Sequence, residues 1–145
     1  MQTCNKMMWL CGTLILLSVM GCSQKNVQTY PGSKLAKDEI AILTAERSAD
    51  ANIVIRRVNG VDTLRDRPPQ IEVLPGKLVV RVEVSKLGGS TDAYADLRSI
   101  NTVTFEALPG RAYSVRGKFV DGLGQVWVMD DRNAMVPAIT TAAEK

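Results

Sequence analysis

The chain contains no histidine, and this absence excludes much of the usual catalytic chemistry. The commonest general base, the commonest zinc ligand and the ordinary Ser–His and Cys–His pairs are all unavailable. Aromatic residues make up only 5% of the 145 residues, so a core must be built from valine, isoleucine, leucine and alanine. The net charge of +3 is too small to suggest a nucleic-acid-binding protein. Length and an average hydrophobic content predict one folded domain plus any segment removed by processing.

Motifs of nucleophilic and phosphate-binding sites are also missing. The chain has no G-x-S-x-G or S-x-x-K sequence, and without histidine a serine would need lysine or an amine as its base. Gly88-Gly89 and Gly122-x-Gly124 lack the strand–loop–helix context and the lysine of a phosphate-binding loop, and are predicted to be turns. Tyr113 and Trp127 are expected in the core rather than on a ligand platform.

The acidic residues offer two weak candidates for chemistry. Asp130-Asp131, with Asp121 before them, is the nearest approach to a cation site, but no calcium-loop spacing supports it and solvated turn residues are the better interpretation. Glu72 and Glu106 are two carboxylates that could serve as a catalytic acid–base pair. Both are expected to be exposed carboxylates on the polar faces of strands. The sequence therefore predicts no catalytic, cofactor-binding or metal-binding residue.

The first 22 residues resemble the signal peptide of a bacterial lipoprotein. The apolar run Trp9–Met20 would rise about 18 Å as a helix, which is too short for a hydrocarbon core of roughly 30 Å. Val19-Met20-Gly21-Cys22 is similar to the lipobox, in which the cysteine thiol receives a diacylglycerol and a peptidase cuts before it. A conventional signal peptide with a chance cysteine near its end is the alternative.

This resemblance implies that Cys22 is lipidated and begins the mature protein. Cleavage would remove Cys4 and Cys11, leaving no thiol for a disulfide, a nucleophile or a metal site. Several acyl chains make anchoring effectively permanent. Ser23 stands where lipoproteins retained in the inner membrane carry aspartate. The implied location is therefore the outer membrane, with the domain on its periplasmic face rather than on the cell surface.

Three segments are predicted: a signal peptide over residues 1–21, a lipidated flexible tether over 22–37, and one β domain with a small polar tail over 38–145. The polar segment Ser23–Lys37 could extend roughly 50 Å. Asp38–Ala45 favours a short helical turn because acids suit a helix N-terminus. The strand patterns that follow are Asn52–Val58, Val61–Leu64, Gln70–Leu74, Lys77–Val84, Ile100–Ala107, Ala112–Val120 and Gln125–Asp130.

Turn residues separate these strand patterns. Asn59-Gly60 predicts a tight hairpin. Leu74-Pro75-Gly76 recurs as Leu108-Pro109-Gly110, and both sequences fit type II turns. The same choice of turn residues at two places explains this repetition better than an internal duplication of the chain. Another turn is expected at Asp121–Gly124. Successive antiparallel hairpins of about seven short strands predict an all-β fold, a small antiparallel β-sandwich or open barrel.

The strand and turn motifs resemble those of a group of uncharacterised bacterial envelope lipoproteins, and the Leu-Pro-Gly hairpins are similar to PEGA-type surface modules. The resemblance implies a fold and a location in the cell envelope, but no activity. Members often carry histidine after the Pro-Gly, where this chain has Lys77 and Arg111, so no role of that histidine is transferred. The motifs are Tyr30-x-Gly32, a short acidic helix near Asp38–Leu43, Ile55 to Asn59-Gly60, Ile71-Glu72-Val73-Leu74-Pro75-Gly76, Thr104-Phe105-Glu106-Ala107, Gly110-x-x-Tyr113 and Trp127-x-x-Asp130.

Four arginines flank the first predicted hairpin. Guanidinium groups pair with phosphates, which are abundant at the outer membrane, so these arginines are a candidate contact for an anionic partner. The alternative is a solvated rim paired with neighbouring aspartates. The four residues are Arg56, Arg57, Arg65 and Arg67.

The sequence thus predicts an outer-membrane lipoprotein with a non-enzymatic domain that binds or braces another envelope component, a protein or an anionic lipid. It predicts no cofactor and no nucleic-acid partner. An envelope hydrolase with an unusual Ser/Lys or carboxylate site is the alternative. A concave pocket with converging polar groups would favour the hydrolase, and a closed sandwich with an apolar edge patch would favour binding.

Overall fold

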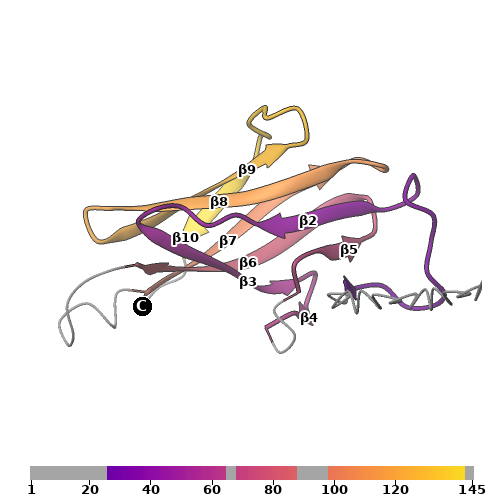
Figure 1. Cartoon of the computed structure of the whole chain (residues 1–145), viewed down its shortest axis with the longest axis horizontal. Coiled ribbons are helices and arrows are strands. Elements are labelled where there is room, and N and C mark those ends of the chain that lie inside the picture. The colour runs from indigo at the N-terminus through magenta and orange to yellow at the C-terminus, as the bar shows by residue number, and fades with distance from the viewer. Residues whose placement is uncertain (1–25, 65–67, 88–97, 143–145) are drawn as a thin grey trace, which may run out of the picture.

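The computed structural model describes residues 26–64, 68–87 and 98–142, and every regular element in them is a strand. The strands form two five-stranded sheets that do not close into a barrel (Figure 1), which confirms the predicted all-β sandwich. No helix of membrane-spanning length occurs in those three ranges. The strands are β1 (Val27–Gln28), β2 (Ala41–Ala45), β3 (Ala51–Val58), β4 (Val61–Asp62), β5 (Ile71–Val73), β6 (Gly76–Lys86), β7 (Arg98–Ala107), β8 (Ala112–Val120), β9 (Leu123–Asp130) and β10 (Ile139–Ala142).

The first sheet has the order β1-β5-β2-β8-β9 and the second has the order β10-β7-β6-β3-β4. The second sheet is antiparallel throughout. The first is mixed, because β1 runs parallel to β5 and β2 runs parallel to β8. In Figure 1, β2 and β8 lie in the upper layer above β3 and β6. The expected antiparallel pairing is therefore wrong for these two pairs.

The core between the sheets is made mainly of β-branched residues, as the low aromatic content predicts. Alternate residues of β6 point inward, and Leu78, Val80, Val82 and Val84 are each at most 1% exposed. Tyr113 is the main aromatic exception: its ring packs on Phe105 with centroids 5.3 Å apart, and its hydroxyl accepts a hydrogen bond from the N–H of Leu108 at 2.8 Å. The tyrosine thus buries its ring with its polar atom satisfied.

The hairpin predicted at Asn59-Gly60 is confirmed. Asn59 and Gly60 have φ angles of 47° and 86°, and Val58 pairs with Val61 across them. Positive φ at both central residues matches the right-handed twist of the flanking strands.

The two Leu-Pro-Gly turns, by contrast, do not close hairpins. The first joins β5 to β6 and the second joins β7 to β8, and each pair of strands is divided between the two sheets. Because Gly76 pairs with Ala107, the two corners lie at the same end of β6 and β7. The repeated Leu-Pro-Gly sequence therefore forms two neighbouring turns, at each of which the chain passes from one sheet to the other.

The structure also differs from the sequence prediction at the N-terminal end of the domain. Asp38–Ala45 does not form the expected helical turn: a single hydrogen-bonded turn, in which Glu39 donates to the O of Ala36, and a bend at Ile40 lead into β2, which lies between β5 and β8. From Asn26 onward the predicted flexible tether packs on the sheet: β1 pairs with β5, and Tyr30 is 7% exposed. Polar composition suggested a free linker, but backbone pairing to an open sheet edge does not need apolar side chains.

Substitution of Gly76 tests the corner geometry. Gly76 has a φ of 111°, which strains any β-branched residue, so Gly76→Val should lower the free energy of unfolding by about 1–3 kcal/mol in urea titrations. The exposed neighbouring substitution Lys77→Val should change it by less than about 0.5 kcal/mol. Equal stability of the two variants would contradict the corner geometry.

Candidate functional site

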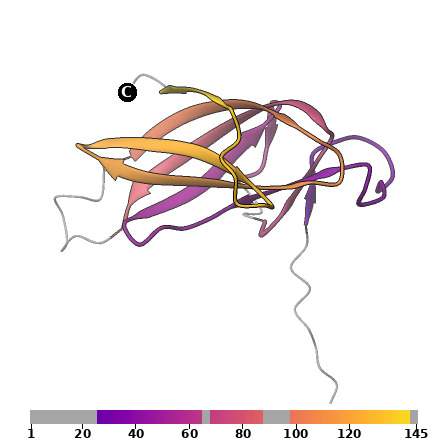
Figure 2. The ribbon, with the colours of Figure 1, turned by 90° about the horizontal axis from the view of Figure 1, so that it is seen from above.

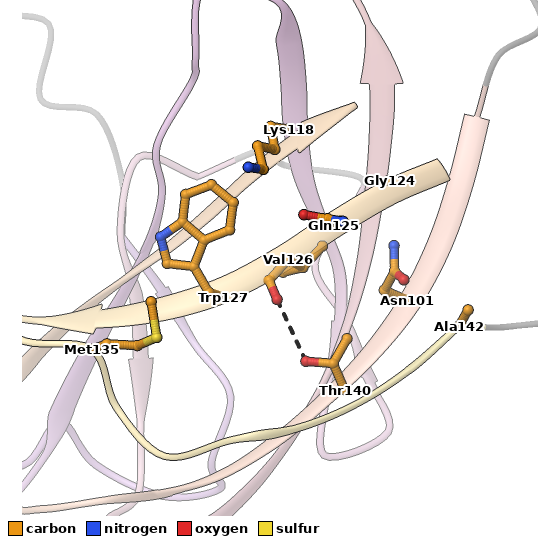
Figure 3. A pocket seen from close by; sticks show the side chains of 9 residues that line it. All are labelled: Asn101, Lys118, Gly124, Gln125, Val126, Trp127, Met135, Thr140 and Ala142. Atoms are coloured by element: carbon orange, nitrogen blue, oxygen red, sulfur yellow. Dashed lines mark hydrogen bonds between the residues drawn. The ribbon is translucent and has the colours of Figure 1, made fainter. Parts of the chain in front are cut away.

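A groove runs along the seam where the edge of the first sheet, β9, meets the edge of the second sheet, β10. Its larger part has a volume of about 600 Å³, and an adjoining part of about 460 Å³ shares Val126, Trp127, Met135 and Thr140 with it. Figure 3 shows Trp127 and Lys118 on one side of β9, and Thr140, Asn101 and Ala142 on the other. The larger part is lined by Asn101, Lys118, Gly124, Gln125, Val126, Trp127, Met135, Thr140 and Ala142.

One wall of the groove is the backbone edge of β9. A two-residue turn, Asp121-Gly122, joins Val120 to Leu123, so alternate residues of β9 bond to β8 while the others direct their N–H and C=O groups outward. The second half of this outward edge is capped, because Val136 donates to the O of Val128 at 2.9 Å and Asp130 donates to the O of Ala134. The first half stays open.

The floor of the groove is the inner face of β10. Thr140 pairs with Val103 and Ala142 pairs with Asn101, so these four side chains share the inward face of the second sheet. Val103 and Asn101 are buried, whereas Thr140 and Ala142 are exposed. The reason is that β9 lies mainly over β7 and β6, and β10 reaches it through the hydrogen bond from Thr140 to the O of Val126. The last strand of the second sheet therefore extends beyond the first sheet (Figure 2).

Glycines hold β9 in this position. A Cβ on Gly124 would lie 2.8 Å from the Cβ of Ser99 and 2.9 Å from the Cβ of Val84. These distances are shorter than side chains tolerate, so the start of β9 approaches the second sheet more closely than any other residue type allows. The predicted four-residue turn Asp121–Gly124 is accordingly corrected to two residues, with Gly124 inside β9.

The arginine candidates are only partly brought together. Arg56 and Arg57 both lie on the outer side of β3, because a bulge between Ile55 and Arg57 shifts the alternation of side chains. Arg56 forms an ion pair with Glu83, and Arg57 lies 3.9 Å from Asp62. Both thus have acidic partners: Asp62 is a neighbouring aspartate of the kind that the solvated-rim alternative names, whereas Glu83 is a buried residue of β6. Arg65 and Arg67, like Cys22, lie outside the described residues.

The carboxylates proposed as an acid–base pair are separated. Glu106 is exposed on β7, but the expectation of an exposed Glu72 is wrong: this residue is 4% exposed on β5. The N-terminal segment covers it, with the Nζ of Lys34 at 2.9 Å and the Nδ2 of Asn26 at 3.5 Å from its Oε1. Glu72 therefore fastens the N-terminal segment to the sheet.

The suggested cation site is an ion-pair cluster. Arg111 donates from Nη2 to Asp130 and from Nε to Asp131, each at 2.8 Å, while Asp121 lies at the other end of β9. Hydrogen bonds from the backbone N–H groups of Ala134 and Arg132 lower the pKa of Asp130, and the hydrogen bond from Arg111 lowers that of Asp131. No group of three acidic or cysteine side chains able to hold a metal occurs in the described part of the chain.

The groove was not predicted as a site, although part of its signal is in the sequence. Trp127 alternates with Val126 and Val128, so if the valines face the core the tryptophan must face outward. It is half-buried on that outer face, in contrast to the core position expected for it. The contributions of Asn101 and Thr140 depend on sheet order, which no local pattern shows.

Comparison with other proteins gives no relative: no family model, no curated protein and no solved structure matches the chain.

The Arg111 cluster predicts a specific dependence of stability on pH. Because folding lowers the pKa of Asp130, its contribution is present above the unfolded value of about 3.9 and is lost as the pH falls through the folded value. Asp130→Asn should therefore flatten the decline in unfolding free energy between about pH 5 and pH 2, measured by urea titration. An unchanged slope would contradict this assignment. Asparagine retains the Oδ1 acceptor for the turn, so the fold should survive.

Proposed function

We propose that this protein is a lipid-anchored outer-membrane lipoprotein whose non-enzymatic β domain binds another envelope component. The observation that carries the proposal is the groove beside β9, which lies at the edge of the first sheet opposite to β1. The N-terminal segment joins the domain at β1, so a partner in the groove would not compete with the anchor.

The groove lining supports binding rather than hydrolysis. It contains no serine and no carboxylate, and Thr140 uses its hydroxyl to donate to the O of Val126 at 3.5 Å. Lys118, the only cation of the lining, lies across β9 from Thr140 (Figure 3). A Thr/Lys nucleophile pair needs the two groups within hydrogen-bond reach. The apolar wall of Trp127 and Met135 instead suits a contact surface.

The anchor would place the domain close to the membrane. Four residue steps separate Cys22 from Asn26, whose side chain already contacts Gln70 and Glu72. At about 3.3–3.6 Å per step, the folded domain begins within roughly 14 Å of the lipidated residue, in place of the roughly 50 Å expected for a free tether. Arg57, 50% exposed near the β4 edge, lies toward the same side of the sandwich and would add a weak contact with anionic headgroups.

The lipid anchor is tested by replacing its attachment site. Cys22→Ser should abolish processing and acylation, and the protein should leave the outer-membrane fraction or persist as an unprocessed precursor. Intact-mass spectrometry checks the modification and sucrose-gradient fractionation checks the location. An unmodified wild-type N-terminus at another residue would contradict the proposal.

The binding role is tested by photocrosslinking in native membranes. A photoreactive residue in place of Gln125, which is exposed in the groove, should give a discrete adduct, while the same residue in place of exposed Lys77 on β6 should not. The adduct should weaken with Cys22→Ser, because anchoring raises the local concentration for a membrane-bound partner. Equal labelling from both positions, or hydrolysis of envelope substrates by the purified protein, would contradict a binding role for the groove.

A further inference from the structure

We infer that the groove takes an extended segment of a partner protein, which adds to β9 as a sixth strand of the first sheet and carries an acidic residue toward Lys118. The inference rests on the proposed function and specifies the chemistry of its partner. Three features support it: the open backbone edge, the uncovered face beside that edge, and the charge of the lining.

The open edge offers hydrogen-bonding groups at strand spacing. The two-residue turn makes Val120 and Leu123 a hydrogen-bonded pair, so Leu123, Gln125 and Trp127 bond to β8. The N–H and C=O groups of Gly124 and Val126, which lie between them, therefore point outward. Among the described residues, only the hydroxyl of Thr140 reaches these groups, in a long 3.5 Å hydrogen bond to the O of Val126. An extended peptide presents the complementary groups, which is how strand addition gives affinity.

The uncovered face lies where the added strand would stack. Strands within a sheet are about 4.8 Å apart, so a strand paired with β9 lies one step beyond it, over β10. Thr140 and Ala142 point to that space, and Trp127 lies on the other side of β9 (Figure 3). Met135 lies at the end of the space, where it bridges to Met129 along the same edge of β9. Small or β-branched side chains on one face of the peptide would fill the volume of about 600 Å³ beside Asn101.

The positive charge of Lys118 in the groove lining favours a peptide with an acidic residue. Lys118 is the only charged residue that lines either part of the groove, and it has no ion-pair partner among the described residues. Residues 136–142 carry no charge at all. An acidic residue in an otherwise uncharged peptide segment therefore complements the groove, while a basic one is disfavoured.

A second copy of this chain fits less well. Antiparallel pairing of two β9 strands about Val126 would place Gly124 of one copy opposite Val128 of the other. That position is already occupied, because Val136 bonds to the O of Val128 and Met135 bridges to Met129. The capping turn thus limits self-pairing but leaves the open half of the edge accessible to a short peptide.

The test uses the full chain in detergent with a synthetic peptide of alternating threonine and valine and one central aspartate. Residue-resolved amide hydrogen exchange should slow at least tenfold at Gly124 and Val126 on peptide addition, and not along β1. Methylation of alternate peptide nitrogens, which removes donors but keeps the side chains, should weaken binding at least tenfold. Lys118→Gln should weaken binding about threefold at low salt, as expected for one exposed ion pair, while the control Lys77→Gln should not.

Each other result overturns the inference. Undiminished binding of the methylated peptide would indicate a side-chain pocket for a small apolar or saccharide ligand. Protection of β9 that depends on protein concentration without peptide, with a dimer in sedimentation, would indicate a second copy. No protection at any peptide concentration would exclude strand addition. The assay needs neither the lipid nor the native partner, so its failure is distinct from loss of membrane location or of the Gln125 adduct.

Discussion

The close approach of β9 to the second sheet is the constraint on which the rest of the groove depends. Gly124 lies against Val84 and Ser99, and Gly117 on β8 lies against Ile53: a Cβ on Gly117 would be 2.8 Å from the Cδ1 of Ile53. Because these two inward-facing residues have no side chain, the β8–β9 hairpin packs closely against β6 and β7. Because the hairpin is held there, β9 lies mainly over β6 and β7, and Thr140 and Ala142 of β10 stay exposed even though Thr140 donates to the O of Val126.

The opposite side of the sandwich is closed by the chain itself. The segment from Asn26 to Lys34 supplies both a backbone strand beside β5 and polar partners for Glu72. A buried carboxylate is costly without such partners, so the attachment of the segment is coupled to the stability of the sheet. From Asn26 onward the segment is thus part of the sheet edge.

The parts of this fold that depend on local patterns are predictable, and the parts that depend on sheet assignment are not. Period-two alternation located β3, β6, β7 and β8 to within two residues, and Asn59-Gly60 fixed its hairpin. Leu-Pro-Gly indicated a turn correctly, but local chemistry does not show whether the next strand stays in the same sheet. The short strand β2 was mistaken for a helical turn, since five residues between two strands carry little periodicity of their own.

The four sheet edges of the sandwich differ in how they are protected against pairing with other chains. β1 and β4 are two residues long, and Asp62 on β4 lies opposite Arg57, so a short length and charge discourage pairing there. The second half of β9 is capped by residues 134–136. Among the strands that the structure describes, the seam between the first half of β9 and the uncharged β10 lacks these features. An unprotected edge without a partner would favour aggregation, so the partner strand proposed above would complete the protection of the edges.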